Sequence, residues 1–460
     1  METYLFLGGS AAVIALVVTP LVRLLALRIG VVDEPGGRRV HQGAVPRLGG
    51  VAVLVAGVGA LVLARALGLE VFAVLLSYGW SLQWLLAGTL LMVAVGVADD
   101  VWGLGPAPKL AVEILAAFMA LAGGYGFTAV TNPFTGGYIQ LGTLGGLFTL
   151  LWVVGITNAF NLIDGLDGLA AGTGLIASVT LLVVSLIEGR PDATLLAATV
   201  AGALAGFLYF NFSPASIFLG DSGSLLLGYL LAVVSVQSLQ KGATTVVIIA
   251  PILALGLPIL DTLLAVARRF LVSGFASIFR ADQEHIHHRL VDMGMTQRRA
   301  VLVLYAVCVA LGLMAFLAVT VRGLGKGVVV GVLALATYVA VRKLGYPLHR
   351  SGPPLGAAAA RRALIYGAGA SAVVQRLSRN GGIDCQFIGI VDDRPSLWGQ
   401  EVDGIRVLGG GEQLGEIIRA HGASLIWVAS DGIEPGRLEM ATAACRAAGA
   451  EVRCVTLNAE

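Results

Sequence analysis

The sequence predicts a polytopic α-helical membrane protein that carries an α/β domain at its C-terminal end. Of its 460 residues, 57% are hydrophobic and only 13% are charged, and the mean hydropathy is +0.87. A water-soluble globular protein of this length does not have such a balance. A formal net charge of +2 gives no indication of a nucleic-acid partner.

About eleven apolar runs are long enough to cross the hydrocarbon core as helices. They cover residues 3–24, 48–68, 80–98, 107–123, 143–159, 168–188, 193–210, 222–240, 244–265, 299–320 and 325–342. If the first run crosses the membrane from the outside to the inside, only five basic residues fall in the connections on the outer side. They are Arg65, Arg190, Lys241, Arg322 and Lys326. The other Lys and Arg residues fall on the inner side, as the positive-inside rule expects of a cytoplasmic face.

The same alternation of sides places every polar cluster of the helical region on the cytoplasmic side. These clusters hold Asp99 and Asp100, Asp164 and Asp167, Asn211 and Asp221, and His285, His287 and His288. A carboxylate at the centre of a membrane helix costs about 2.5 to 3.5 kcal/mol, so several kept together indicate a partner or a function. We therefore expect the chemistry of this protein at the cytoplasmic ends of its helices.

Five aspartates, at positions 99, 100, 164, 167 and 221, could converge on one hard divalent cation. Mg²⁺ takes one or two carboxylates together with waters and phosphate oxygens, so these residues favour metal-assisted phosphate chemistry. The alternative is that Asp167 and Asp221 cap the helices that follow them, and that Asp99 and Asp100 lie in a solvated loop.

Two further polar segments allow more than one interpretation. The "HIHH" run at residues 285–288 could bind a metal, donate to phosphate or lie in a wet loop. Phe218 could stack on a nucleobase while Asn211 reads its edge, although an aromatic residue at the membrane interface is equally expected.

The C-terminal region changes in composition after residue 342. Residues 343–360 form a basic linker with Pro and Gly, and residues 361–460 alternate between strand and helix patterns, which predicts a parallel sheet. We therefore expect three parts: a transmembrane domain at 1–342, the linker at 343–360 and an α/β domain at 361–460.

Four motifs together carry a family resemblance. They are "VADD" with Lys109 downstream, "NAFNLIDGLDGLAAG", "PASIFLGDSGSLLLG" and "HIHHRL". In this order they resemble the polyprenyl-phosphate N-acetylhexosamine-1-phosphate transferases, which share a family (glycosyltransferase 4) with the phospho-N-acetylmuramoyl-pentapeptide translocases. The resemblance covers about residues 1–300, and the first loop, "VVDEPGGRRVHQGAVPRLGG", also looks like the family's N-terminal cytoplasmic signature.

The resemblance implies an Mg²⁺-dependent enzyme (Mn²⁺ being an alternative) with about eleven membrane helices in a bacterial cytoplasmic membrane. It implies transfer of a sugar 1-phosphate from a UDP-N-acetylhexosamine to a polyprenyl phosphate lipid, with release of UMP and with the active site and the C-terminal domain in the cytoplasm. A homodimer is one assembly that we expect. Neither the identity of the sugar nor the choice between a one-step and a covalent two-step route follows from the sequence.

Matching the motifs residue by residue gives expected roles. The metal ligands are Asp221 and Asp100, and the other residues in the catalytic set are Asp99, Asp164, Asp167 and His287. The substrate-binding set is Lys109, Asn158, Asn161, Asn211, Phe218, His285, His288, Arg289, Arg39, His41 and Arg47. This chain has "HIHHRL" at the position where the muramoyl-pentapeptide translocases have a motif like "HHHFE". We therefore expect it to resemble the N-acetylhexosamine-1-phosphate transferases of the family.

The C-terminal region resembles the Rossmann-like domain that precedes some bacterial sugar-modifying enzymes. Gly367 and Gly369, followed by Asp392, satisfy much of a dinucleotide fingerprint, with Ala372 at the third glycine position. NAD or another nucleotide is one expectation for this domain, and a regulatory or assembly role without a nucleotide is the other.

A secondary transporter or ion channel is the alternative from another class, because acids within the membrane also mark ion pathways. A transporter should place carboxylates near the bilayer midplane, whereas these acids gather at cytoplasmic helix ends.

Overall fold

The computed structural model describes the chain outside residues 34–44, 70–78, 132–137, 239–248, 274–284, 322–330, 332–360, 368–384, 403–404, 430–441, 444, 448 and 456–460. The chain divides into two compact units, Met1–Leu348 and His349–Glu460. We call them the helical unit and the α/β unit.

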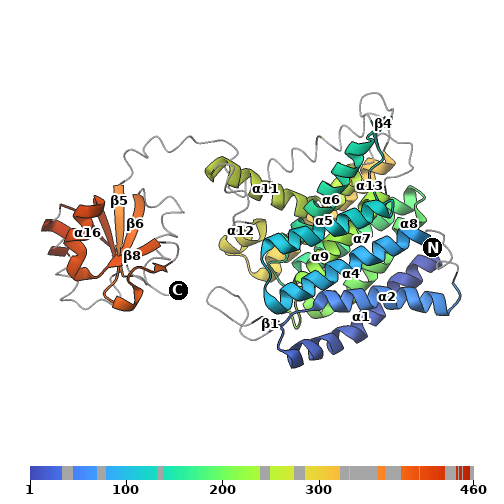
Figure 1. The fold of residues 1–460 in the computed structure, drawn as a ribbon, viewed down its shortest axis with the longest axis horizontal. Coiled ribbons are helices and arrows are strands. Elements are labelled where there is room, and N and C mark those ends of the chain that lie inside the picture. Colours follow the sequence, from blue (N-terminus) through green and yellow to red (C-terminus); the bar gives the residue numbers. More distant parts are fainter. Residues whose placement is uncertain are drawn as a thin grey trace. The chain divides into compact units, whose positions relative to one another are not determined.

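The helical unit is a bundle with two short antiparallel hairpins (Figure 1). The hairpins pair β1 (Val32–Asp33) with β2 (Val45–Pro46) and β3 (Ala129–Thr131) with β4 (Tyr138–Gln140). The described helices are α1 (Glu2–Ile29), α2 (Gly49–Ala66), α4 (Gly79–Trp102), α5 (Pro106–Ala122), α6 (Thr143–Ile163), α7 (Leu169–Ile187), α8 (Pro191–Asn211), α9 (Gly220–Gln237), α10 (Ile249–Ala254), α11 (Gly256–Ser273), α12 (Ile286–Asp292) and α13 (Gln297–Thr320).

Within the described residues, seven helices are long and apolar enough to cross a membrane: α1, α2, α4, α6, α7, α8 and α13. A multi-pass membrane protein is therefore confirmed, and the expected number of eleven spans stays a prediction. The expected spans at 107–123 and 222–240 are the helices α5 and α9, of 17 and 18 residues. The expected span at 325–342 lies almost wholly outside the described residues.

The expected span at 244–265 is broken within its described part. α10 ends at Ala254 and α11 begins at Gly256. Pro258 is the third residue of α11, and proline cannot donate the backbone hydrogen bond that would continue an uninterrupted helix. The break starts a separate helix, α11, which carries Asp261.

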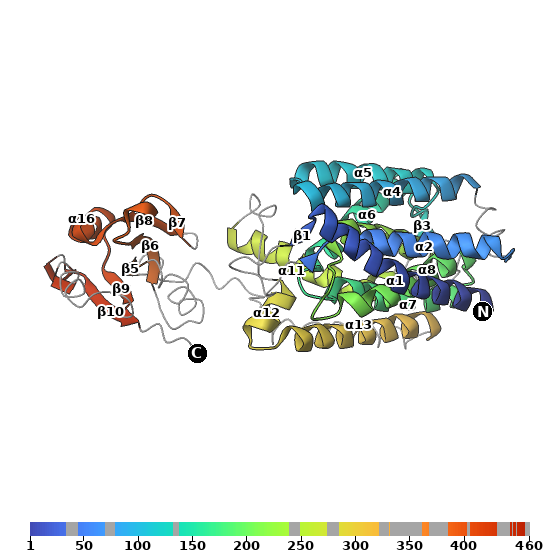
Figure 2. The ribbon, with the colours of Figure 1, turned by 90° about the horizontal axis from the view of Figure 1, so that it is seen from below.

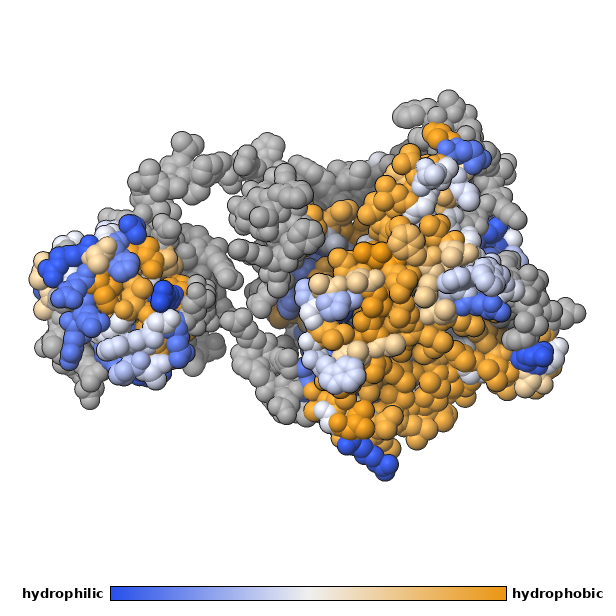
Figure 3. All heavy atoms as spheres, viewed as in Figure 1, coloured by the Kyte–Doolittle hydropathy of each residue, from blue (hydrophilic) through white to orange (hydrophobic). Residues whose placement is uncertain are grey.

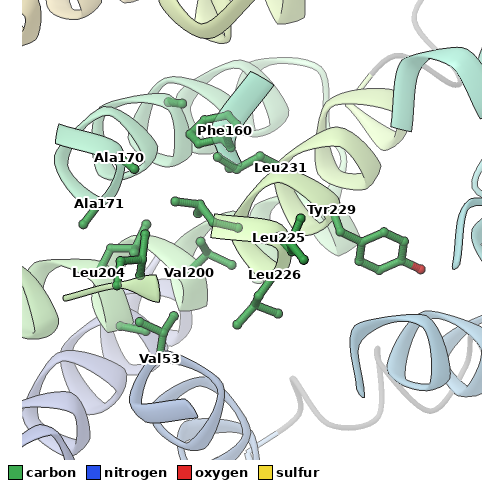
Figure 4. Packing of buried hydrophobic residues seen from close by; sticks show 14 of the residues in the cluster. Val53, Phe160, Ala170, Ala171, Val200, Leu204, Leu225, Leu226, Tyr229 and Leu231 are labelled. Carbon is green, nitrogen blue, oxygen red and sulfur yellow. The ribbon is translucent and has the colours of Figure 1, made fainter. Parts of the chain in front are cut away.

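Helix α9 is the central element of the bundle, because nearly all of its residues from Ser222 to Gln237 are buried. It packs against α2, α4, α6, α7 and α8. Figure 4 shows Leu225, Leu226 and Leu231 of this helix among the side chains of its neighbours. The outer helices turn apolar side chains outward, and Figure 3 shows one face of the unit as a broad apolar surface, as lipid contact requires.

Glycines allow α9 to approach its neighbours closely. A Cβ atom at Gly50 of α2 would overlap the backbone of Ser222 and Gly223, and one at Gly96 of α4 would overlap Ser222. Small residues at such contacts let helix backbones come together in a membrane. The packing therefore brings the start of α9 against the end of α4.

We expect Gly50→Ala to destabilise the helical unit by about 1–3 kcal/mol, the usual cost of overpacking. The control is Gly57→Ala on the same helix, where a Cβ atom would meet only Thr199 Cγ2 at an ordinary 3.5 Å. Thermal unfolding in detergent measures both variants. Equal midpoints for the two would contradict the close contact between α2 and α9.

Both views place the β1–β2 hairpin, α11 and α12 at one end of the helical unit, and the N-terminus at the opposite end (Figures 1 and 2). The hydrogen bonds given below place the C-terminal ends of α4 and α6 and the N-terminal ends of α5 and α9 together. The polar clusters of the sequence therefore meet at one end of the bundle.

The α/β unit is built on a six-stranded sheet in the order β10-β9-β5-β6-β8-β7. Its strands are β5 (Arg361–Tyr366), β6 (Cys385–Val391), β7 (Glu401–Val402), β8 (Ile405–Gly409), β9 (Leu425–Ala429) and β10 (Glu451–Val455), with helix α16 at Leu414–His421. All neighbours pair in parallel except β7 and β8. The expected parallel sheet is present, and its strand order reverses between β5 and β9.

Candidate active site

A lysine joins two acidic residues at the centre of the site. Lys109 Nζ, in the first turn of α5, lies 2.8 Å from Asp221 Oδ2 of α9 and 3.2 Å from Asp99 Oδ2 of α4. These residues are 112 and 10 positions apart from Lys109 in the chain. The other oxygen of Asp99, Oδ1, is buried and has no hydrogen-bond partner among the described residues.

Asp100 binds backbone groups of α9, whereas its neighbour Asp99 binds Lys109. Its Oδ1 and Oδ2 accept hydrogen bonds from the backbone N–H groups of Asp221 (2.9 Å) and Ser222 (3.1 Å). It thus caps α9 from another helix, where free N–H groups need acceptors. Gly220 has φ +72°, and a Cβ atom there would lie 2.6 Å from Asp100 Oδ2, so glycine is required for this approach.

Asp99, Asp100 and Asn161 lie on helices rather than in the connections expected around them, and Asn158 lies on a helix as expected. Helix α4 continues to Trp102 and α6 continues to Ile163. The solvated-loop alternative for Asp99 and Asp100 is therefore wrong, because both end a packed helix. The cause is that α4 and α6 extend beyond their apolar runs, where site contacts satisfy the polar side chains.

The capping alternative for Asp167 and Asp221 is also wrong. The N-cap of α7 is Gly168, and that of α9 is Leu219, with Asp221 inside the first turn. Asp167 Oδ2 instead accepts a hydrogen bond from Ala215 N, 3.0 Å away in the α8–α9 connection. Asp167 therefore ties the loop after α6 to the loop before α9.

Asp164 ends α6 next to the acid cluster. Burial, and then the carboxylates of Asp221 and Asp100, raise the pKa of Asp164 well above its ordinary value, while Arg47 acts in the opposite direction. One turn earlier, Asn161 Nδ2 donates to Ser224 Oγ of α9 at 3.0 Å. Asn161 is thus hydrogen-bonded to the start of α9, and Asp164 lies close enough to interact electrostatically with the carboxylates of Asp221 and Asp100.

The segment before α9 is fixed by backbone pairing with the segment around β2. Phe218 N donates to Pro46 O at 2.9 Å, and Gly49 N donates to Phe218 O at 3.0 Å. Arg47, between these partners, forms an ion pair with Asp33. Asn211 donates to Ile217 O at 3.0 Å, while its Oδ1 is buried without a partner among the described residues.

The expected histidine segment forms the start of α12, with His285 as its N-cap. The rings of His285 and His287 are stacked at 5.7 Å, and the His288 ring lies 4.3 Å from that of His287. Burial, and then the neighbouring His288, lower the pKa of His287 to about 3. His287 is therefore neutral near pH 7, and Arg289 follows on the same short helix.

Sequence reasoning missed Glu113, which is buried on α5 one turn after Lys109. Its Oε2 accepts a hydrogen bond from Asn158 Nδ2, whose other bond goes to Val154 O at 2.9 Å. Asn158, expected to bind substrate, is thus held by a buried acid. The available signal was an acid four positions from Lys109 in an otherwise apolar helix, which places both on one face.

Several expected residues lie elsewhere. Arg39, His41 and Gly369 are outside the described residues. In the α/β unit, Gly367 follows β5 with φ +96°. Asp392 follows β6, and its two oxygens accept hydrogen bonds from the Arg394 guanidinium at 2.9 and 3.0 Å.

The donor set fits Mg²⁺ in the manner that this ion uses with phosphate substrates. In the described part of the chain, no three His, Cys, Asp or Glu residues form a ready-made metal cage. Mg²⁺ needs only one or two carboxylates when waters and phosphate oxygens complete its shell. Asp99 Oδ1, which is buried without a partner among the residues that the structure describes, offers one such oxygen. Asp221, whose Oδ2 already accepts from Lys109, offers a second carboxylate, and acids outnumber bases around them.

The fold and this acid cluster define a multi-pass membrane protein with a site suited to a cation and phosphate groups. The chain belongs to the Glycosyl transferase family 4, whose model matches residues 82–239. These residues run from α4 to α9 and include Asp99, Asp100, Lys109 and Asp221.

Relatives with printed activities support the same family. A probable undecaprenyl-phosphate N-acetylglucosaminyl 1-phosphate transferase of Bacillus subtilis is 39% identical over 292 residues, which cover 64% of this chain and 78% of the relative. A decaprenyl-phosphate N-acetylglucosaminephosphotransferase of Mycolicibacterium smegmatis is 36% identical over 368 residues, which cover 75% and 89%. A phospho-N-acetylmuramoyl-pentapeptide-transferase of Streptococcus uberis is 33% identical over 260 residues, which cover 53% and 76%.

Proposed function

We propose that this protein transfers N-acetylhexosamine 1-phosphate from a UDP-sugar to polyprenyl phosphate and releases UMP. The printed names of two relatives support the lipid and the N-acetylglucosamine phosphate. The observation that carries the proposal is Lys109 between Asp99 and Asp221, because one ammonium between acids of two helices builds a site for phosphate groups and a cation.

The proposed reaction exchanges one phosphorus–oxygen bond for another. An oxygen of the lipid phosphate attacks the phosphorus next to the sugar, the bond to the bridging oxygen breaks, and UMP leaves with that oxygen. A phosphomonoester has a second pKa near 6, so the lipid phosphate is largely dianionic at pH 7 and needs no strong base. Bound Mg²⁺ would neutralise charge that develops on the diphosphate.

The two adjacent aspartates have different roles in this proposal, and Asp99 takes the metal-ligand role that the motif match assigned to Asp100. Both oxygens of Asp100 are used by backbone N–H groups of α9, so Asp100 positions the helix that carries Asp221. Asp99 keeps a buried oxygen without a partner among the described residues. We therefore assign Asp99 to the reacting phosphate or its cation, and Lys109 to the diphosphate that carries the leaving UMP.

We further propose that the site faces the cytoplasm. The support is the concentration of Lys and Arg in the connections on the same side as the acids, which is the positive-inside pattern. This placement also separates the proposal from a secondary transporter, because the acids gather at one end of the bundle rather than at its middle.

The experiment is a UMP-release assay on full-length protein in nanodiscs with UDP-N-acetylglucosamine. We expect release only when polyprenyl phosphate and Mg²⁺ are both present, with Mn²⁺ as a substitute. Omission of either component provides the control. Release that is equally fast without the lipid would contradict transfer to polyprenyl phosphate.

A second candidate acts on a UDP-N-acetylmuramoyl-pentapeptide, and the Streptococcus uberis relative supports it more distantly. The "HIHHRL" sequence of α12 favours the N-acetylhexosamine reaction. The same assay with both UDP-sugars separates these candidates.

For the α/β unit we propose a Rossmann-like, nucleotide-binding type of domain. The support is the parallel sheet, whose order reverses between β5 and β9, since such a reversal is where open α/β sheets bind ligands. Asp392, the acid of the expected dinucleotide fingerprint, is paired with Arg394, so bound NAD would have to displace this pair.

A further inference from the structure

A carboxylate that none of the four sequence motifs contains, Asp261 of α11, holds the histidine segment. We propose that Asp261 is a positioning residue that orients the His285 ring and anchors the first turn of α12 against the bundle. This inference rests on the proposed function only where turnover is the readout, because the geometry can be measured without turnover.

Both oxygens of Asp261 are used by the start of α12. Oδ2 lies 2.8 Å from His285 Nδ1, and Oδ1 accepts a hydrogen bond from Ile286 N at 2.7 Å. Asp261 is 2% exposed and His285 is 4% exposed, so water does not compete for these bonds. A carboxylate buried this far is costly unless its oxygens are satisfied, and this segment satisfies both.

The contact with Asp261 selects one form of the His285 ring. An ionised carboxylate accepts hydrogen bonds and cannot donate, so Nδ1 must carry the proton. The other nitrogen, Nε2, is then the position that can accept a hydrogen bond, gain a proton or bind a metal ion. Partners of this kind fix the tautomer and the ring orientation of functional histidines.

His285 contacts the loop between Asp164 and Asp167 through the ring of His287. The His285 ring is stacked parallel to that of His287, at 9° and 5.7 Å. His287 in turn packs so closely on Gly165 that a Cβ atom at position 165 would overlap its Nε2. Asp261 therefore supports a chain of contacts that ends at the acidic loop of the site.

Asp261→Asn separates orientation from simple capping. The Asn oxygen can still accept from Ile286 N, so the cap of α12 is kept. The Asn amide, however, presents N–H to His285 Nδ1 and favours the tautomer with the proton on Nε2. A positioning role predicts that this isosteric change matters, and a purely structural cap predicts that it does not.

The first measurement is the ¹⁵N spectrum of the histidine rings in full-length protein in nanodiscs. The chain has only six histidines, and the signals missing in His285→Gln assign this ring. We expect a protonated Nδ1 in the wild type and a protonated Nε2 in Asp261→Asn. A wild-type ring protonated only on Nε2 would overturn the proposal, whether or not Asp261→Asn folds.

The second measurement is UMP release with saturating polyprenyl phosphate. We expect Asp261→Asn to lower kcat about tenfold or more, the loss typical of removing the partner of a functional histidine, with a smaller change in KM. The matched control is Asp192→Asn, which makes the same change in another buried acid. Asp192 lies at the start of α8, about 28 Å along the helix from Asn211 at the end that faces the site.

The combination of variants decides whether Asp261 acts through His285. In a His285→Gln background, adding Asp261→Asn should lower kcat by less than twofold, because the ring to be oriented is gone. The proposal would be overturned if the double variant lost the full product of the kcat losses of Asp261→Asn and His285→Gln. Equal kcat losses for Asp261→Asn and Asp192→Asn would also overturn it. A wild-type protein that releases no UMP would instead refute the proposed function, and the ¹⁵N result would still stand.

Discussion

Asp221→Asn is expected to abolish UMP release, with a loss of at least about 100-fold in kcat, as is typical when a group that stabilises transition-state charge is removed. Asp221 is the residue at which α4, α5 and α9 meet: its Oδ2 lies 2.8 Å from Lys109 and its backbone N–H is held by Asp100. The neutral amide keeps the size of the side chain but loses the charge that binds Lys109 and a cation. UMP release at saturating substrates measures the loss.

The matched control for Asp221→Asn is Asp192→Asn, which makes the same chemical change in a buried acid remote from the site. We expect it to keep near-normal turnover. If Asp221→Asn retained a near-normal rate in protein that unfolds at the wild-type temperature, Asp221 could not be the central ligand of the site.

Lys109→Met is expected to lower both activity and stability. Methionine has a similar length but no charge, so Asp99 and Asp221 would face each other without the ammonium between them. The Asp99 and Asp221 side chains are only 13% and 27% exposed. The loss of stability should therefore lie between the losses typical of exposed and of buried ion pairs, at about 1–3 kcal/mol. Activity should fall about 100-fold, because the same ammonium is assigned to the diphosphate.

Added Mg²⁺ distinguishes the two effects of Lys109→Met. A cation that binds Asp99 and Asp221 should restore part of the unfolding temperature of the variant, without restoring turnover. Lys109→Arg should recover stability better than activity, since a planar guanidinium does not match the position of an ammonium. An unfolding temperature that is unchanged in Lys109→Met would contradict the Lys109 bridge.

The helical architecture was predictable from the apolar runs, because a membrane helix forms its backbone hydrogen bonds within itself and is recognisable from its apolar composition. The ends of the helices were less predictable. α4 extends to include Asp99 and Asp100, and α6 extends past Asn161, because site contacts rather than lipid stabilise these last turns. The break before Gly256 was missed because the run 244–265 is mostly apolar and long enough for one span, although Gly256 and Pro258 within it disfavour a continuous helix.

The main acids of the candidate site were identifiable because they repeat at helix ends on one predicted side of the membrane. Their individual tasks were not. Asp167 and Asp221 each precede an apparent helix and so looked like caps, whereas the cap of α9 is Asp100, 121 residues away in the chain. A capping partner that comes from another helix leaves no spacing signal in the sequence.

Glu113 and Asp261 show the other limit of sequence reasoning. Each is a single acid within an apolar helix, outside any cluster, and each is explained only by a distant partner, Asn158 or His285. Isolated acids of this kind deserve examination as supports of a site when they fall on the same helix face or at the same membrane depth as a polar cluster.

The position of the transferred phosphorus tests the central claim most directly. Full-length protein in nanodiscs is given polyprenyl phosphate, Mg²⁺ and UDP-N-acetylglucosamine labelled with ³²P at the phosphorus next to the sugar. Transfer of a sugar 1-phosphate predicts that the label moves to the lipid as a diphosphate-linked sugar while the UMP released is unlabelled. Label that remains in UDP, with an unlabelled sugar on the lipid, would contradict the account.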